Sequence, residues 1–138
     1  MSINVEVKAM RIAILLAIFP IWASQAANAD VRHRSFPNAV QGTWASKAEL
    51  CQADGKSNIV ITESSVVGPN NSCAVEYVVE SATPSGPIYS GHGSCLNRTE
   101  PGNKSAMNLV IRPRSDDRIL IGTNLDTLAE YQRCDKAP

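Results

Sequence analysis

Residues 74–81 read Ala-Val-Glu-Tyr-Val-Val-Glu-Ser, and their order decides which class of fold we expect. Val75, Tyr77 and Val79 fall on one face of an extended chain, and both glutamates fall on the opposite face. Apolar residues that recur with a period of two are typical of a β-strand with one buried face. The stretch therefore predicts a half-buried strand rather than a helix.

Similar short stretches lie on both sides of this strand. Further strands are predicted over residues 41–45, 58–62, 65–67, 88–96, 106–112, 118–122 and 125–134. A short helical turn is predicted just before Cys51, because Ser46 and Glu49 have capping-box spacing. We expect an all-β chain, a small antiparallel β-barrel or a compact sandwich of about seven short strands. The barrel is favoured because closure leaves no exposed strand edge, and side chains are expected to fill so small an interior.

Two glycines interrupt the strand predicted over residues 88–96. Gly91 and Gly93 contribute no side chain to a sheet face. A glycine inside a strand commonly marks a β-bulge or a sharp bend of a barrel wall. We therefore expect an irregularity of the sheet at this place.

The N-terminal region has the pattern of a secretory signal peptide. Basic residues precede the apolar run Ile12–Trp22, and the small residues 27–29 (Ala-Asn-Ala) follow it as a cleavage site. The run is shorter than the ~20 residues that span a bilayer, which argues against the alternative of a membrane anchor. We expect cleavage after Ala29 and export to the periplasm or beyond it, with translation starting at Met1 or at Met10.

The chain has 138 residues, which fits one domain after removal of the signal peptide. We expect a signal peptide at 1–29, a flexible lead-in at 30–39 and a single β domain at 40–138. The formal net charge of zero argues against a nucleic-acid partner, because neutralising phosphates requires a basic excess. The mature protein is expected to carry no integral membrane span.

All four cysteines, Cys51, Cys73, Cys95 and Cys134, follow the predicted cleavage site. An even number of cysteines in a small exported domain predicts two disulfides. A zinc site is disfavoured because no close C-x-x-C pair occurs and the chain has only two histidines. Four cysteines allow three pairings, and joining sequence neighbours as Cys51–Cys73 and Cys95–Cys134 is preferred because it closes the shorter loops.

No arrangement of residues in the sequence predicts catalysis. His92 and Ser94 fall on one face of a predicted strand, but neither a third orienting group nor a G-x-S-x-G elbow accompanies them. Asp116 and Asp117 lie in a predicted hairpin turn, whereas the paired carboxylates of a glycosidase face each other across a cleft. We therefore expect no enzyme activity, no cofactor and no metal ion.

One loop has a more specific pattern. Residues 85–89 read Ser-Gly-Pro-Ile-Tyr and match S-G-x-x-Y, which resembles a loop of the membrane-bound and periplasmic inhibitors of chicken-type lysozyme. The resemblance implies a small exported β-barrel whose loop enters the lysozyme cleft. There a serine hydroxyl and a basic side chain would meet the two catalytic carboxylates. By position in the motif, the inhibitory loop would use Ser85, Gly86 and Tyr89.

The basic partner of this loop is less directly indicated. The second motif of the inhibitor family, Y-x-x-x-T-K-G, is absent from the chain. Lys104, in the turn-like segment 101–105, is the nearest loop cation and takes that role in our prediction. His92 is a further candidate contact residue.

The order of landmarks along the chain also resembles the periplasmic peptidoglycan hydrolase inhibitors of alphaproteobacteria, the PhiA-like group. Residues 42–45 (Gly-Thr-Trp-Ala), then Cys51, Cys73 and a terminal Arg-Cys pair carry this resemblance. It implies inhibition of lysozyme-type muramidases and makes Trp44 a core residue.

Two functions of different classes are thus predicted. The first is a periplasmic inhibitor that binds lysozyme or an endogenous muramidase and protects the cell wall. The second is a β-barrel that binds a small ligand or an envelope component, with a structural or stress role. A muramidase inhibition assay distinguishes the two.

Overall fold

A computed structural model describes residues 29–52 and 54–134, and the predicted signal peptide lies outside these residues apart from Ala29. In the described chain, nine strands and two short 3-10 helices follow one another. The elements are β1 (Val31–His33), β2 (Gly42–Ala45), η1 (Ala48–Cys51), β3 (Ile59–Ile61), β4 (Ser65–Val67), β5 (Asn71–Thr83), β6 (Gly86–Asn97), β7 (Lys104–Ser115), β8 (Arg118–Gly122), η2 (Leu125–Thr127) and β9 (Ala129–Arg133).

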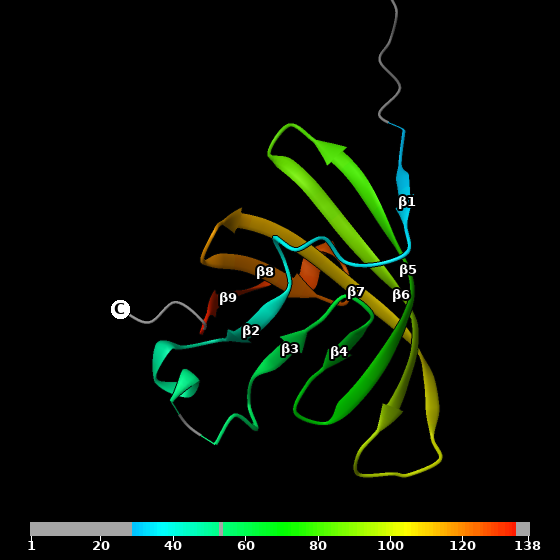
Figure 1. Cartoon of the computed structure of the whole chain (residues 1–138), viewed down its shortest axis with the longest axis vertical. Helices are drawn as coiled ribbons and strands as arrows, with labels where there is room; N and C mark the ends of the chain where they lie inside the picture. Colours follow the sequence, from blue (N-terminus) through cyan, green and yellow to red (C-terminus); the bar gives the residue numbers. More distant parts are fainter. Residues whose placement is uncertain (1–28, 53, 135–138) are drawn as a thin grey trace, which may run out of the picture.

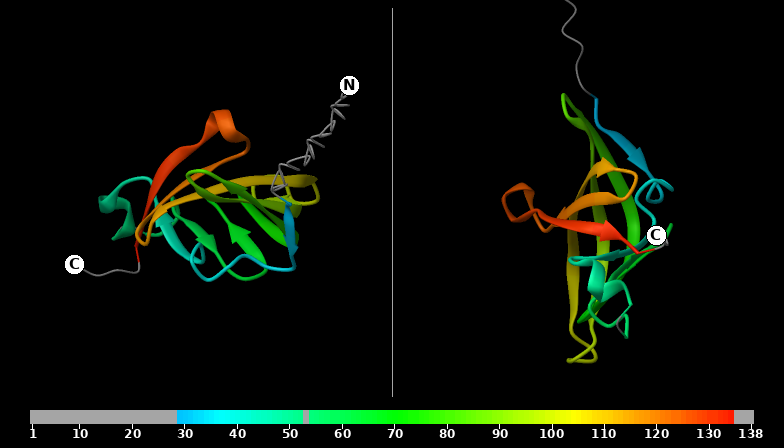
Figure 2. Two further views of the ribbon diagram at one scale, coloured as in Figure 1. Left: turned by 90° about the horizontal axis from the view of Figure 1, so that it is seen from above. Right: turned by 90° about the vertical axis from the view of Figure 1, so that its left-hand side faces the viewer.

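Eight of these strands close into an antiparallel barrel (Figure 1). The order around the wall is β5-β4-β3-β2-β9-β8-β7-β6, and β6 pairs again with β5. Long strands β5, β6 and β7 form one side, and the short strands complete the rest. The views in Figure 2 show the strands curving into one wall, with η2 projecting away from it. The all-β barrel predicted from the alternating pattern is therefore confirmed.

The segment predicted to be a flexible lead-in contains β1, which lies outside the closed wall, and two side chains of the core. β1 pairs with residues 78–80 of β5, where the short strand β4 no longer reaches. Phe36 and Val40 are 1% and 0% exposed, so this segment fills the core. The sequence pattern did not indicate these contacts, because a short segment with two buried side chains has no periodicity to detect.

Seven large side chains are fully buried: Trp44, Phe36, Ile61, Ile111, Ile119, Val40 and Val78. Gly91 makes room for one of them, since a Cβ there would lie 2.6 Å from the Phe36 ring and 2.9 Å from the Met107 methyl group. These seven side chains fill the middle of the barrel, and a cavity of about 550 Å³ that is open to solvent lies at one end, lined by residues of β3 to β7.

The irregularity predicted from the strand glycines is present as a β-bulge. The register of β5 against β6 shifts between Val75 and Tyr77, and Gly93 lies opposite. A Cβ on Gly93 would lie 1.9 Å from the Ala74 carbonyl oxygen, so only glycine fits there. The bulge also reverses the predicted alternation, because Val78 rather than Tyr77 is buried in the core.

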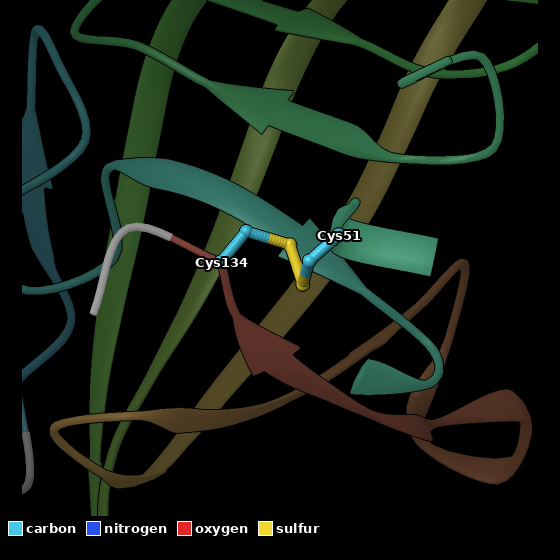
Figure 3. Close-up of a disulfide and its surroundings, with 2 residues drawn as sticks. All are labelled: Cys51 and Cys134. Atoms are coloured by element: carbon cyan, nitrogen blue, oxygen red, sulfur yellow. A yellow bond between two sulfur atoms is a disulfide. The ribbon is translucent and has the colours of Figure 1, made fainter. Parts of the chain in front are cut away.

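The chain forms two disulfides, as predicted, but the cysteines pair differently from the predicted pairs. Cys73 pairs with Cys95, which lies directly opposite it in the β5–β6 register. Cys51 of η1 pairs with Cys134, at the end of β9 (Figure 3). The predicted pairing of Cys51 with Cys73 and of Cys95 with Cys134 was wrong. Cys51 follows β2 and Cys134 follows β9, and these two strands are neighbours in the sheet although the cysteines are 83 positions apart in the sequence.

Candidate functional site

The barrel has two ends that differ in construction. At one end, which we call the Ser85 end, lie the β5–β6 turn and the β7–β8 turn (Figure 1, top of β5 and β6). At the other, the Lys104 end, lie the β4–β5 and β6–β7 turns, joined by a hydrogen bond from the Arg98 N–H to the Asn70 carbonyl at 2.9 Å. The predicted site residues are distributed over both ends.

Ser85 occupies the tip of the β5–β6 hairpin and is exposed. Gly86 follows with φ of 107°, a conformation that side chains other than glycine rarely adopt. The Thr83 hydroxyl donates a hydrogen bond to the Gly86 carbonyl oxygen at 2.6 Å, across the turn. Together with Pro84, these features give a stiff loop that presents a hydroxyl group to solvent.

A shallow groove lies beside this tip. Its walls come from three segments: Ser85–Pro87, Pro113–Asp116 and Asn38-Ala39, with Arg133 between them. Arg114 is the extra residue of a β-bulge between Pro113 and Ser115. Its side chain is exposed, and among the described residues it makes no hydrogen bond or ion pair. The groove thus combines a serine hydroxyl with an uncommitted guanidinium group.

Arg133 joins two of the three groove segments, the one that contains Ala39 and the one that contains Asp116. Its guanidinium donates hydrogen bonds to the carbonyl oxygens of Ala39 at 2.8 Å, Gln41 at 2.6 Å and Asp116 at 2.9 Å. The same group lies over the Trp44 ring, 4.2 Å from its centroid. Each of its three nitrogens therefore donates to a carbonyl oxygen inside the protein, which leaves Arg114 as the groove cation that can reach a partner.

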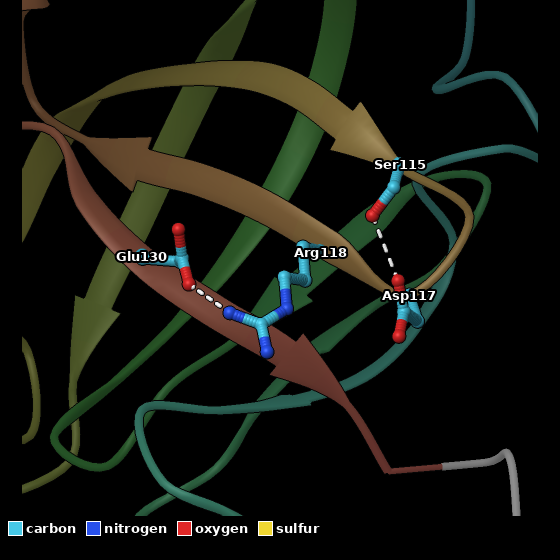
Figure 4. A network of polar contacts seen from close by, with 4 residues as sticks. All are labelled: Ser115, Asp117, Arg118 and Glu130. Carbon is cyan, nitrogen blue, oxygen red and sulfur yellow. Dashed lines mark hydrogen bonds and ion pairs between the residues drawn. The ribbon is translucent and has the colours of Figure 1, made fainter.

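Short polar contacts brace the adjoining β7–β8 turn (Figure 4). The Ser115 hydroxyl donates to Asp117 Oδ1 at 2.7 Å, and Arg118 Nη1 lies 2.5 Å from Glu130 Oε1 on β9. Asp116 and Asp117 therefore belong to a hairpin turn, as predicted.

Tyr89, the last residue of the S-G-x-x-Y pattern, faces the interior. It is 8% exposed and belongs to the hydrophobic core. Burial, with a smaller contribution from the negative charge of Glu80, raises the pKa of its phenol above 10. Tyr89 therefore supports the base of the hairpin and is not placed to touch a partner.

His92 lies on the outer face of the barrel wall. Its ring stacks on Tyr77 with centroids 4.6 Å apart, and the guanidinium of Arg32 covers the other side of Tyr77 at 3.6 Å. This stack connects β1, β5 and β6. His92 pairs with Tyr77, whereas the hairpin tip follows the pair Thr83–Gly86 several residues farther along the strands. His92 is therefore not part of the Ser85 groove.

Lys104 lies opposite Leu96, at the far end of β6 from Ser85. Since β6 has 12 residues and a strand rises about 3.3 Å per residue, roughly 35 Å of strand separates them. The structure therefore does not bring Lys104 to Ser85. Sequence analysis missed Arg114. In a series of antiparallel strands every second turn lies at the same end, so the β5–β6 and β7–β8 turns could have been expected to lie together.

The two disulfides indicate an oxidising, extracytoplasmic location. Within residues 29–52 and 54–134, no helix is long and apolar enough to cross a membrane. The same residues hold no cluster of three or more His, Cys, Asp or Glu side chains suited to a metal ion. Comparisons of the chain with protein-family models, with curated proteins and with solved structures gave no match, so the groove itself carries the functional argument.

Proposed function

We propose that the protein is a periplasmic inhibitor of lysozyme-type peptidoglycan hydrolases and that it acts through the Ser85 end. The observation that carries the proposal is the juxtaposition of an exposed hydroxyl on a stiff hairpin with an uncommitted arginine in one groove. The S-G-x-x-Y pattern at residues 85–89 agrees with this assignment.

The chemistry of a muramidase cleft matches this pair. Such a cleft holds two carboxyl groups, one acting as general acid and the other as nucleophile or charge stabiliser. A serine hydroxyl can donate to one carboxyl group, and a guanidinium can form charge-assisted hydrogen bonds with the other. Arg114 takes the role that the sequence had given to Lys104.

The construction of the loop favours tight binding. A loop held by Pro84, by the Thr83 hydroxyl and by Gly86 has little conformational freedom to lose on docking. The bulge at Arg114 is a common device for directing a side chain near a functional site. Export into the periplasm, by the predicted signal peptide, would bring the inhibitor to the compartment where muramidases cut the wall.

A cell-wall clearing assay tests the proposal. The disulfide-bonded protein is added to lysozyme, and separately to a muramidase of the same organism, acting on purified peptidoglycan. We expect dose-dependent inhibition, and the double variant Ser85→Ala with Arg114→Met should weaken it roughly 100-fold, since losing a buried charged contact costs about 2–5 kcal/mol.

Lys104→Met is the matched control, because it removes a cation from the opposite end and should leave inhibition unchanged. Circular dichroism confirms that each variant is folded. Absence of inhibition of both enzymes would overturn the proposed function. Inhibition that survives in the folded double variant would overturn the assignment to the Ser85 end.

A further inference from the structure

The Lys104 half of β7 has an unpaired edge. β8 pairs with residues 110–115 of β7 and turns away at Gly122. β6 covers only the other edge, from Lys104 to Ile111. In the described chain no strand pairs with residues 104–109 on the β8 side. Alternate residues of an antiparallel strand direct their N–H and C=O groups to opposite edges, so this edge presents backbone donors and acceptors.

The cavity of about 550 Å³ lies along this edge. Five consecutive residues, Ser105–Leu109, line it. A cavity on one face of a strand would be lined by every second residue only. Because all five consecutive residues line it, the cavity extends from the inner face of β7 around the strand edge. The deeper wall is apolar and consists of Ile59, Val66, Met107, Leu109 and the Cys73–Cys95 disulfide.

The rim of the cavity is polar but uncharged. Asn71, Thr123 and Asn124 stand around the opening, and among the residues that the structure describes no charged side chain lines the cavity. A charged group entering it would lose hydration without an ionic partner, which is costly. The site therefore selects uncharged groups.

Three kinds of occupant can be compared. A small apolar ligand would fill the cavity but leave the backbone groups of β7 without protein partners. A second barrel could pair edge to edge, but its strand is held in its own wall and cannot place side chains in the cavity. A separate extended peptide does both, because its backbone pairs with β7 while alternate side chains point inward.

We propose that the edge of β7 at residues 104–109 is a β-strand addition site for an extended peptide segment of another protein, with uncharged, apolar side chains at alternate positions. The added strand would continue the barrel wall beyond η2 and cover the cavity. This site lies at the opposite end from Ser85, so it is separate from muramidase inhibition.

The direct test uses a short fluorescein-labelled peptide of alternating threonine and valine, titrated into the disulfide-bonded protein. Binding is followed by fluorescence anisotropy, and amide hydrogen exchange is measured by NMR. We expect saturable binding and slowed exchange of amides within residues 104–109. Saturating peptide should leave inhibition of lysozyme, where present, unchanged.

Two backbone-modified peptides identify the role of strand pairing. One carries N-methyl groups on the valines and the other on the threonines. Because N–H groups of alternate residues face opposite edges, only one of the two should lose binding. A peptide with glutamate in place of valine should not bind.

Protein variants localise the site. Ser105→Glu places a carboxylate at the cavity and should weaken binding at least about tenfold, a loss of about 1.4 kcal/mol. Leu96→Glu is the matched control, because Leu96 is 53% exposed at the same level of the barrel and does not line the cavity. It should bind the peptide as the natural protein does.

Several results would overturn the proposal. Equal binding of both N-methylated peptides would show that only side chains are recognised, as for a small apolar ligand. Protection of residues 104–109 in a peptide-free dimer would identify a second copy as the occupant. No binding at millimolar peptide, or unchanged binding to Ser105→Glu, would exclude strand addition at this edge.

Discussion

The two ends of the barrel use the same strands for different purposes. At the Ser85 end, the turns are short and braced, and Arg133 joins residues 39–41 to the β7–β8 turn. At the Lys104 end, β8 stops at Gly122, and a cavity and an unpaired strand edge remain. The comparison shows that one strand, β7, is paired on both sides over residues 110–111 and has an open edge over residues 104–109, because its neighbour β8 is shorter.

The largest expected contrast is between two core positions on β7 itself. Ile111 is fully buried, so Ile111→Ala should cost about 2–5 kcal/mol of unfolding free energy through lost burial and a new cavity. Leu109 is half-buried and borders an existing cavity, so Leu109→Ala should cost roughly 1 kcal/mol. Urea unfolding measures both, and equal costs would show that the Lys104 end is as tightly packed as the rest.

A smaller effect concerns the two arginines of the Ser85 end. Arg133→Met should destabilise the protein by about 2 kcal/mol, because it removes three hydrogen bonds from a charged group to carbonyl oxygens. Arg114→Met should change stability by less than about 0.5 kcal/mol, since Arg114 is exposed. Thermal unfolding of the two variants tests the distinction. A similar loss of stability in both variants would contradict the assignment of Arg133 to structure and of Arg114 to partner contact.

The smallest expected effect depends on pH and on Tyr89. Its pKa is raised by burial and by Glu80, so the folded state keeps the phenol proton at pH values where the unfolded chain releases it. Stability should therefore fall as pH rises above about 10, the unperturbed tyrosine value. Tyr89→Phe has no proton to lose, so part of this decline should disappear. Urea midpoints at neutral and alkaline pH measure it, and an identical decline in both proteins would argue against the assignment.

Local patterns predicted much of the wall but failed where distant segments meet. The strand at residues 118–122 was predicted with the bounds that β8 has. The segment 125–134, expected to be one strand, forms η2 and then β9. The N-cap of η2 is Asn124, whose side chain accepts hydrogen bonds from the backbone N–H groups of Asp126 and Thr127. The helical turn before Cys51 forms, although its N-cap Lys47 makes no side-chain capping bond. A helical turn can be predicted from nearby residues, but the residue that caps it depends on the surrounding chain.

The candidate site was predicted only in part for the same reason. Ser85 and Gly86 are adjacent in sequence, so their place in one hairpin turn could be expected from the Pro-Ser-Gly composition. The proximity of Arg114 depends on the meander that brings two turns to one end. The burial of Tyr89 depends on which face of β6 turns inward, and Tyr89 shares that inward face with Cys95, which is also in the core.

By itself, the sequence determined the all-β class and the presence of two disulfides, because periodicity and an even cysteine count are local or compositional properties. Only the tertiary structure decided the cysteine pairing, the burial of Phe36, the partner of Ser85 and the open edge of β7. Each of these depends on register and strand length in a closed barrel. Such contacts join residues far apart in the chain, and no local pattern encodes them.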